Sequence, residues 1–192
     1  MKWLCDSIFE HTAEEYGLIY EAMTDSRRER VDRLKKENDR LRSLLGELLV
    51  KKAVAEEFGI ENAELYSLPN GRPMLKNNGI YVSISHCDER VACAVASEPV
   101  GIDTERLVPR DMSLAQRICT DEELVYLFGK MPTEKDYLSK NRELTERFYE
   151  IWTAKEAYFK KRGTGITDFK SVNIMTLKRQ MFYVGEYLIQ IV

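Results

Sequence analysis

The amino-acid sequence predicts an α+β fold of two similar halves, each a long helix packed on a small antiparallel sheet. Two long stretches of helix-forming residues are each followed by a glycine and then by short runs of apolar and β-branched residues. This order occurs once in residues 37–97 and again in residues 143–192, without a sequence repeat of fixed period. We therefore expect pseudo-duplicated halves over residues 1–99 and 100–192, with an active site at their interface.

The composition narrows the class of protein. The 192 residues carry a net charge of −3, and 44% of them are apolar while 32% are charged. This balance is typical of globular proteins and argues against a nucleic-acid partner, which would favour a basic surface. The sequence has no apolar run long enough to span a membrane and no export signal, so we expect no membrane partner. Four cysteines without Cys-x-x-Cys spacing predict free thiols in a cytoplasmic protein.

The first long helix is expected over residues 24–58. Asp25 or Ser26 is placed to cap its start, and Gly59 lies just beyond its end. Acidic residues alternate with the basic residues between 27 and 36, so we expect a solvated helix face there rather than a nucleic-acid site. An apolar stripe with helical spacing predicts the buried face: Leu41, Leu44, Leu45, Leu48 and Leu49.

The later elements follow from local patterns. Thr120 is placed to cap a helical segment, and Gly163 is placed to end the second long helix. We expect strands over residues 81–85, 91–96 and 100–105, helical residues 113–129, and the second long helix over 143–162. Residues 169–192 are expected to form two or three strands with turns near 178–180 and 185–186.

Two acidic side chains, Asp103 and Glu105, stand one residue apart in the segment PVGIDTERLVP at residues 99–109. If this segment is a strand, both side chains leave the same face. Two like charges about 4 Å apart repel by roughly 1 kcal/mol in water and by roughly 4 kcal/mol near a protein surface. Either solvent screens the pair, or a bound cation lies between the two carboxylates.

On the second long helix, Trp152, Glu156, Phe159 and Lys160 share one face. Two interpretations remain open. In the first, the aromatic side chains belong to the core, and Glu156 pairs with Lys160 at its edge. In the second, Glu156 is a third carboxylate ligand beside the two strand acids. Three carboxylates favour Mg²⁺, which takes its remaining ligands from water and substrate phosphates.

Two motifs, GIDTE at 101–105 and WTAKEAYFKK at 152–161, resemble the signatures G-[IV]-D-x-E and W-x-x-K-E-[AS]-x-x-K of the 4′-phosphopantetheinyl transferases. Their order and separation also fit this family. The resemblance extends over residues 27–192 and is closest to the surfactin-synthetase-activating type, in which two halves form a single chain. Further similar stretches are GRP at 71–73, SISH at 83–86 and DRLRSLLGELLVKKAV at 39–54.

The resemblance implies an enzyme that transfers the 4′-phosphopantetheine arm of CoA to a serine of an apo acyl or peptidyl carrier protein. It implies that Asp103, Glu105 and Glu156 hold Mg²⁺, with Mn²⁺ as an alternative, against the CoA pyrophosphate. Glu156 and Lys160 are implied to be catalytic, and Glu156 is also placed to accept the serine proton. Cleavage of a pyrophosphate by a serine needs charge neutralisation and in-line positioning more than covalent help.

The resemblance also implies two binding surfaces on a monomer whose partners are CoA and a carrier protein. The N-terminal half is the expected CoA-binding side, and the C-terminal half is expected to carry the metal and the catalytic helix. The expected CoA contacts are Arg42, Arg72, Pro73, Ser85, His86, Lys155 and Lys160. The expected carrier-protein contacts are Arg110, Met112, Leu114 and Arg117.

A non-catalytic relative that binds CoA or a carrier protein is the alternative. Such a relative is expected to lose at least one residue of the set Asp103, Glu105, Glu156 and Lys160, and all four are present. The enzyme is therefore the favoured interpretation. The residues do not assign the carrier protein to fatty-acid, polyketide or peptide synthesis.

Overall fold

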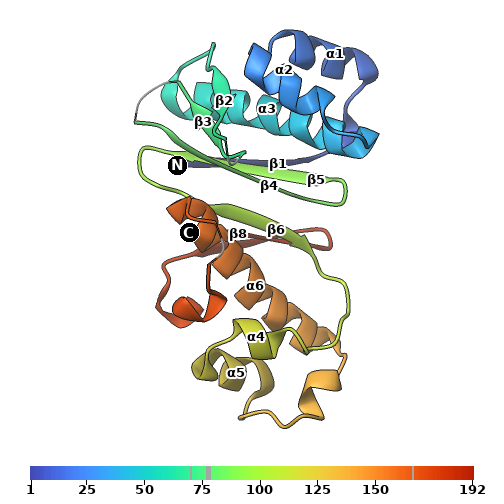
Figure 1. Ribbon diagram of the computed structural model, residues 1–192, viewed down its shortest axis with the longest axis vertical. Helices are drawn as coiled ribbons and strands as arrows, with labels where there is room; N and C mark the ends of the chain where they lie inside the picture. The colour runs from blue at the N-terminus through green and yellow to red at the C-terminus, as the bar shows by residue number, and fades with distance from the viewer. Residues whose placement is uncertain (70, 77–78, 166) are drawn as a thin grey trace.

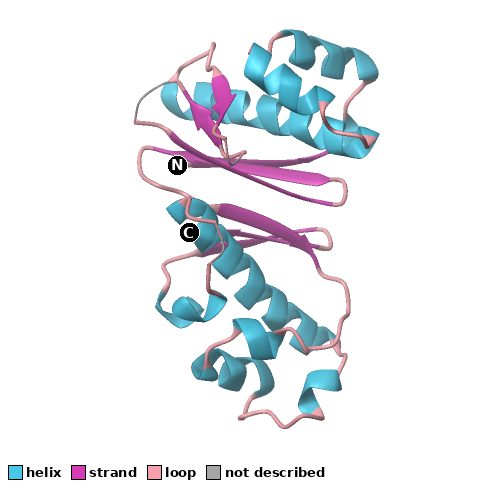
Figure 2. Ribbon diagram, viewed as in Figure 1, coloured by secondary structure: helices cyan, strands magenta, loops and turns pink. Residues whose placement is uncertain are grey.

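The computed structural model describes residues 1–69, 71–76, 79–165 and 167–192. Two small antiparallel sheets lie near the middle of the molecule, with helices on the outer side of each (Figure 1, Figure 2). Up to residue 99 the elements are β1 (Lys2–Ser7), η1 (Ile8–Glu10), α1 (Ala13–Glu21), α2 (Asp25–Asp32), α3 (Glu37–Phe58), β2 (Leu65–Ser67), β3 (Pro73–Leu75), β4 (Tyr81–Cys87) and β5 (Arg90–Ala96). The elements that follow are β6 (Ile102–Arg106), α4 (Ala115–Ile118), α5 (Asp121–Phe128), η2 (Asp136–Leu138), α6 (Arg142–Arg162), η3 (Phe169–Ser171), η4 (Ile174–Thr176), β7 (Gln180–Val184) and β8 (Tyr187–Ile191).

The first sheet has the strand order β1-β5-β4 and packs against α3. Successive side chains of a strand point to opposite faces, and the central strand β5 uses both. Val91, Cys93 and Val95 join the core beneath α3, whereas the alanines of β5 point toward the second sheet. The hairpin of β2 and β3 forms a separate two-stranded sheet beside this half.

The second sheet has the order β6-β8-β7 and packs against α6. Its apolar face meets the first sheet through Ile102, Ile189 and Ile191, which cluster with the small β5 alanines. Trp3 and Phe182 close one side of this contact, with ring centroids 4.5 Å apart. Because alanines occupy little space, β6 can lie close to β4. The backbone N–H groups of Ile102 and Thr104 on β6 donate to the hydroxyls of Ser83 and Ser85 on β4.

The helix expected over residues 24–58 is broken in the structure. It consists of α2 and α3, and between them Lys36 has an extended backbone. The start of α2 also differs from the expectation, because the preceding residue is Thr24, which makes no side-chain cap. Its hydroxyl instead donates to the carbonyl of Leu65 at 2.8 Å. The first 23 residues, for which the sequence predicts no element, form β1, η1 and α1.

Most of the other expected boundaries agree closely with the structure. The exception is the stretch before the expected turn near 178–180, which forms η3 and η4 and not a strand. Thr120 and Glu123 form a reciprocal capping box at the start of α5. Asn141 caps α6, and Gly163 ends it with φ at 69°, a left-handed conformation that glycine adopts without penalty. Within the part of the chain that the structure describes, no helix is both long and apolar enough to cross a membrane.

Candidate functional site

Three elements bring a serine, an aspartate and a lysine together where the two sheets meet. Ser85 of β4 donates to Oδ1 of Asp103 on β6 at 2.8 Å. Nζ of Lys160 on α6 donates to both, at 2.7 Å to Ser85 Oγ and 2.6 Å to Asp103 Oδ1. Ser85 and Asp103 are buried, while the Lys160 side chain is 30% exposed. The lysine thus links an otherwise buried polar cluster to the surface.

The glycine of the GIDTE segment lets α6 approach β6. A Cβ atom on Gly101 would lie 1.8 Å from the carbonyl oxygen of Ala157, far inside van der Waals contact. Gly101 also exchanges two backbone hydrogen bonds with Val192, which hold the start of β6 in place. Only glycine permits this contact between strand and helix, and the contact positions Lys160 over Asp103.

Glu105 leaves β6 on the same face as Asp103, as the strand period predicts. Its Oε1 accepts a hydrogen bond from Nε1 of Trp152 at 3.0 Å, and its Oε2 accepts one from Sγ of Cys87 at 3.4 Å. Burial, and next the charge of Asp103, raise the pKa of Glu105. The sequence did not predict these roles for Trp152 and Cys87, because a strand pattern identifies a face and not the partners across from it.

Glu156 is half-buried beside the same cluster. Burial raises the pKa of Glu156 to about 7. The charge of Asp103 adds to this effect, and the charge of Lys160 opposes it. The charge of Glu105 acts in the same direction as that of Asp103. The three carboxylates therefore lie within one another's electric field. The ion pair of Lys160 is with Asp103, which differs from the Glu156–Lys160 pair of the first interpretation.

The donor chemistry of this cluster fits a hard divalent cation such as Mg²⁺. Carboxylate oxygens are its preferred protein ligands, and Oδ2 of Asp103 is buried without a hydrogen-bond partner. Among the described residues, however, no three His, Cys, Asp or Glu side chains already form a group that could hold a metal ion. This arrangement fits Mg²⁺ bound together with water and substrate phosphates better than an all-protein cage.

A cavity of about 340 Å³ opens beside the cluster. One wall consists of residues from the first 99 of the chain. The other wall consists of α6 and the residues that follow it. Glu156 and Lys160 lie on the α6 wall, opposite Arg72 and Pro73. The remaining lining residues are Gly71, Val82, Ser83, Ile84, Phe159, Gly163 and Gly165.

A second cavity, of about 290 Å³, shares Gly71, Pro73 and Ile84 with the first, so the two adjoin. Its basic side chains are His86 from β4, Arg42 from α3, and Arg27 and Arg30 from α2. This concentration of positive charge suits an anionic ligand.

The side chain of Arg42 is only partly satisfied within the protein, and that of His86 lies in its positive field. Arg42 pairs with Asp39 and donates to the carbonyl of Asp88 at 2.6 Å, while its Nε is buried without a hydrogen-bond partner. His86 is exposed, yet desolvation by its surroundings, followed by the charges of Arg42 and Lys160, lowers its pKa. Additional negative charge in this cavity would relieve the repulsion among these basic side chains.

Arg30 is a cavity residue for which the sequence gave no functional role. Arg27, one turn earlier, is buried and anchors α2 through Glu47 at 3.0 Å and Ser67 at 3.0 Å. That anchor directs Arg30 toward Gly71, whose added Cβ would lie 2.6 Å from the Arg30 guanidinium. Partial burial, and then Arg27, lower the pKa of Arg30. The expectation of a wholly solvated basic face is therefore wrong at Arg27, which is 3% exposed.

Two expected contact residues are buried and cannot meet a ligand or a partner at the surface. Lys155 is fully buried and pairs with Glu123 instead of facing the cavities. Met112 is fully buried in the core under α4 and α5. The motif and its neighbourhood in the sequence do not distinguish these inward side chains from exposed ones. Both expectations are corrected.

The other expected carrier contacts lie at or near the surface. Leu114 is half-buried, and Arg117 on α4 is exposed. The guanidinium of Arg110 lies over the ring of Phe148, 5.0 Å from its centroid, which fixes its direction. These three residues remain available for a protein partner.

Comparison with known proteins gives two family matches. A model described as the 4′-phosphopantetheinyl transferase superfamily matches residues 99–190, and one described as 4′-phosphopantetheinyl transferase, N-terminal, matches residues 9–99. Both carry the same activity in their description, and they meet at residue 99.

Curated relatives give the same result. The chain is 36% identical over 130 residues to 4′-phosphopantetheinyl transferase gsp of Aneurinibacillus migulanus, which covers 67% of this chain and 51% of that protein. It is 29% identical over 157 residues to 4′-phosphopantetheinyl transferase Sfp of Bacillus subtilis, and the match covers 80% of this chain and 66% of that protein. It is 30% identical over 141 residues to 4′-phosphopantetheinyl transferase HetI of a Nostoc species, and the match covers 70% of this chain and 53% of that protein. The chain thus spans between 51% and 66% of these relatives.

The GIDTE and WTAKEAYFKK segments lie within the C-terminal match, and the basic side chains of the second cavity lie within the N-terminal one. Taken together, the matched residues run from 9 to 190, and the chain belongs to the 4′-phosphopantetheinyl transferase superfamily, with similarity to the Sfp type.

Proposed function

We propose that this chain transfers the 4′-phosphopantetheine arm of CoA to a serine of an apo acyl or peptidyl carrier protein, giving the holo-carrier. The observation that carries the proposal is the contact of Lys160 with Asp103 and Ser85, which joins α6, β6 and β4 beside a two-walled cavity. The names of the family and of the curated relatives support the same activity. We place the reaction in the cytoplasm, on a monomer.

In this proposal the chain consists of pseudo-duplicated halves, residues 1–99 and 100–192, with the active site at their interface. Each half contains one long helix packed on a three-stranded antiparallel sheet, which supports the duplication. The two family matches meet at the same boundary. The first cavity supports an interface site, because residues from both sides of that boundary line it.

CoA is proposed to lie along the two adjoining cavities. Its adenine end is assigned to Arg72 and Pro73, and its phosphates to the basic side chains Arg30, Arg42 and His86 of the second cavity. Ser85 and Lys160 are assigned to the pyrophosphate, next to the carboxylates. Charge-assisted hydrogen bonds to phosphate are stronger than neutral ones, and the unpartnered Nε of Arg42 supports such a role.

Asp103, Glu105 and Glu156 would hold Mg²⁺, with Mn²⁺ as an alternative. When bound, the ion supplies positive charge to the pyrophosphate oxygens. Trp152 and Cys87 support this assignment, because each donates to one oxygen of Glu105 and so restricts the rotation of its carboxylate.

The remaining steps fall to the side chains themselves. The carrier serine Oγ attacks the phosphorus that bears the pantetheine arm, and the bond from this phosphorus to the bridging oxygen breaks. The electron pair leaves with 3′,5′-ADP. Lys160 stabilises negative charge that develops on the phosphoryl oxygens. Glu156 accepts the serine proton, a role supported by its place beside Lys160 on the α6 wall of the first cavity.

The carrier protein is proposed to approach over the segment that contains Arg110, Leu114 and Arg117. Arg117 is exposed, and Leu114 offers apolar contact beside it. Since α4 packs beside α6 through the core that both helices share, a carrier bound there would lie close to the catalytic helix.

A direct transfer assay tests the proposal. The protein is incubated with CoA, Mg²⁺ and a panel of apo-carrier proteins, and the carriers are weighed by intact-mass spectrometry. We expect at least one carrier to gain the mass of phosphopantetheine on its serine, and no gain without CoA or in EDTA. Tight CoA binding without any mass gain across the panel would favour the non-catalytic alternative.

A further inference from the structure

A buried ion pair lies next to the proposed site but takes no part in it. Nζ of Lys155 lies 2.6 Å from Oε2 of Glu123, and both side chains are fully buried. Lys155 immediately precedes Glu156 on α6, whereas Glu123 belongs to the first turn of α5. The pair therefore connects the catalytic helix to a separate helix, one residue away from the proposed base.

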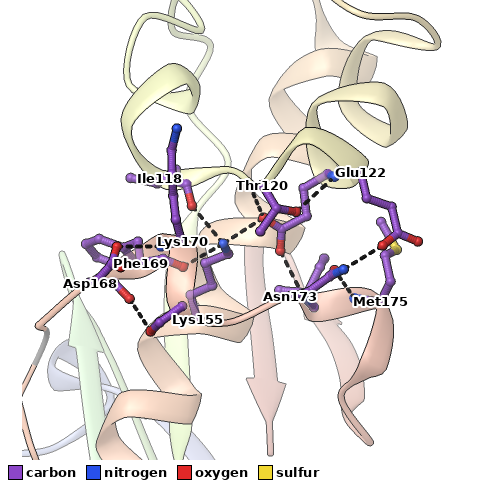
Figure 3. A network of polar contacts seen from close by, with 12 residues as sticks. Ile118, Thr120, Glu122, Lys155, Asp168, Phe169, Lys170, Asn173 and Met175 are labelled. Carbon is purple, nitrogen blue, oxygen red and sulfur yellow. Dashed lines mark hydrogen bonds and ion pairs between the residues drawn. The ribbon is translucent and has the colours of Figure 1, made fainter.

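Each member of the pair also bonds to the backbone of other segments. Lys155 Nζ donates to the carbonyl of Ile118 at the end of α4, at 2.7 Å, and to that of Phe169 in η3, at 2.8 Å (Figure 3). Glu123 accepts from the backbone N–H of Ile174 in η4 at 2.8 Å and from that of Thr120 at 2.7 Å. One ion pair thus fixes four segments against α6.

This arrangement provides more than stability. A buried ion pair loses its hydration, and apolar residues of similar volume often replace such a pair without loss of stability. Apolar side chains, however, cannot fix the direction of four backbone groups. The specific property of the pair is therefore geometric, because its hydrogen bonds set where α4, α5 and residues 169–174 lie relative to Glu156.

We infer that Lys155 and Glu123 are positioning residues: they hold the proposed carrier-facing segment in register with the catalytic helix. α4 follows directly after Leu114 and contains Arg117, and its last residue, Ile118, accepts a hydrogen bond from Lys155. Loss of the pair would therefore displace the carrier-facing residues without touching the CoA cavities. The effect on transfer rests on the proposed function, whereas the effect on the order of these segments does not.

The chain supplies a matched control in the adjacent glutamate. Glu122 also links α5 to η4, through Asn173 Nδ2 at 2.6 Å, but it is exposed (Figure 3). Lys170, next to Phe169, is an exposed lysine that enters the same network through its backbone N–H, which donates to Asp168 at 2.9 Å. Because exposed charged side chains contribute little to stability, Glu122→Ala and Lys170→Met should leave the segments in place.

The test is the double variant Lys155→Met/Glu123→Leu, which removes both charges together and leaves no buried charge unpaired. Amide exchange is measured for residues 118–123 and 169–174, together with the KM for the carrier and the Kd for CoA. We expect exchange protection in both segments to fall by about tenfold or more, and the carrier KM to rise by about tenfold, with the CoA Kd within about twofold of wild type. The two control variants should show none of these changes.

The inference is overturned if the double variant keeps both the exchange protection and the carrier KM of the wild type. It is also overturned if the CoA Kd weakens as much as the carrier KM rises, since the pair would then serve the CoA site. If the variant does not fold, amide exchange of the wild-type protein tests the inference instead. The amides of Thr120 and Ile174 should then open only together with α6, and independent opening would contradict the inference. If the wild-type protein transfers no phosphopantetheine, the proposed function fails. The amide-exchange result still tests the positioning role of Lys155 and Glu123.

Discussion

Individual side chains at the site are held by partners from elements that are far apart in the sequence. The strand period predicted that Asp103 and Glu105 share a face, and the contacts of both confirm it. The period could not identify Trp152 and Cys87 as donors to Glu105, because helix packing decides which side chains lie opposite a strand. For the same reason, the motif that contains Lys155 gave no sign that this lysine is buried.

Gly101 provides a test of the close contact between β6 and α6. In Gly101→Ala the new Cβ would lie 1.8 Å from the Ala157 carbonyl, so the helix must shift. Overpacking of this kind costs about 1–3 kcal/mol or more, and we expect a lower urea midpoint together with weaker transfer. Gly17 in α1 is the control, because no atom lies within 4 Å of its added Cβ. Gly17→Ala should raise stability by roughly 0.5–1 kcal/mol. An unchanged midpoint for Gly101→Ala would contradict the described contact.

The four cysteines are free thiols, and burial raises the pKa of all four, to about 11 for Cys5 and to about 12 for Cys87, Cys93 and Cys119. Cys93 and Cys119 are also fully buried. The thiolate is the reactive form, so at pH 8 these two should react with iodoacetamide far more slowly than a free thiol. Mass spectrometry after alkylation, with and without urea, measures this. We expect both to be labelled only once the protein unfolds. Rapid labelling of Cys93 in the native protein would show that β5 is not buried as described.

Among the elements, the break between α2 and α3 has the largest consequence for the site. No glycine or proline marks it, and residues 33–36 are ordinary helix formers, so the sequence predicted one continuous helix. Tertiary contacts cause the break: the buried Arg27–Glu47 pair draws α2 against α3 and β2. The same contacts bring Arg30 to the second cavity, which explains why its role was not predicted.

The basic side chains of the second cavity, which come from α2, α3 and β4, can be tested with CoA and dephospho-CoA. Arg30→Ala, Arg42→Ala and His86→Ala should each weaken CoA binding by about tenfold or more, because each removes a charge-assisted contact. Binding of dephospho-CoA should weaken less. Lys35→Ala removes an exposed cation from the same region and serves as the control. Calorimetric titration of both ligands measures the difference. Equal losses for the two ligands would show that these residues do not contact the 3′-phosphate.

The α4 surface is tested by charge reversal. Arg117→Glu should raise the carrier KM, more strongly at low salt, where exposed charges are least screened, while the KM for CoA stays constant. Lys178→Glu reverses an exposed charge elsewhere and should change neither constant. Steady-state kinetics at two salt concentrations measures both KM values for each variant. A loss of CoA affinity in Arg117→Glu would place this surface on the nucleotide side instead.

For the whole molecule, the sequence predicted an α+β chain with two long helices and most of the strands, because their apolar periods and end signals are local. It did not predict β1, whose six residues acquire their strand conformation by pairing with β5. Nor could it show how the sheets meet, which depends on small alanines from β5 and on the contact of Trp3 with Phe182. Long-range packing of this kind has no signature within a short window of sequence.

The most direct test of the central claim is the rate of CoA-dependent carrier modification against Mg²⁺ concentration, for wild type, Asp103→Asn and Glu156→Gln. We expect Asp103→Asn to lose activity at ordinary Mg²⁺ levels and to recover part of it in excess. Glu156→Gln keeps size but not proton affinity, so it should bind CoA nearly normally yet lose turnover by about 10²-fold or more. Near wild-type activity of both variants in EDTA would contradict the account, because the carboxylates would then form a solvated edge and not an active site.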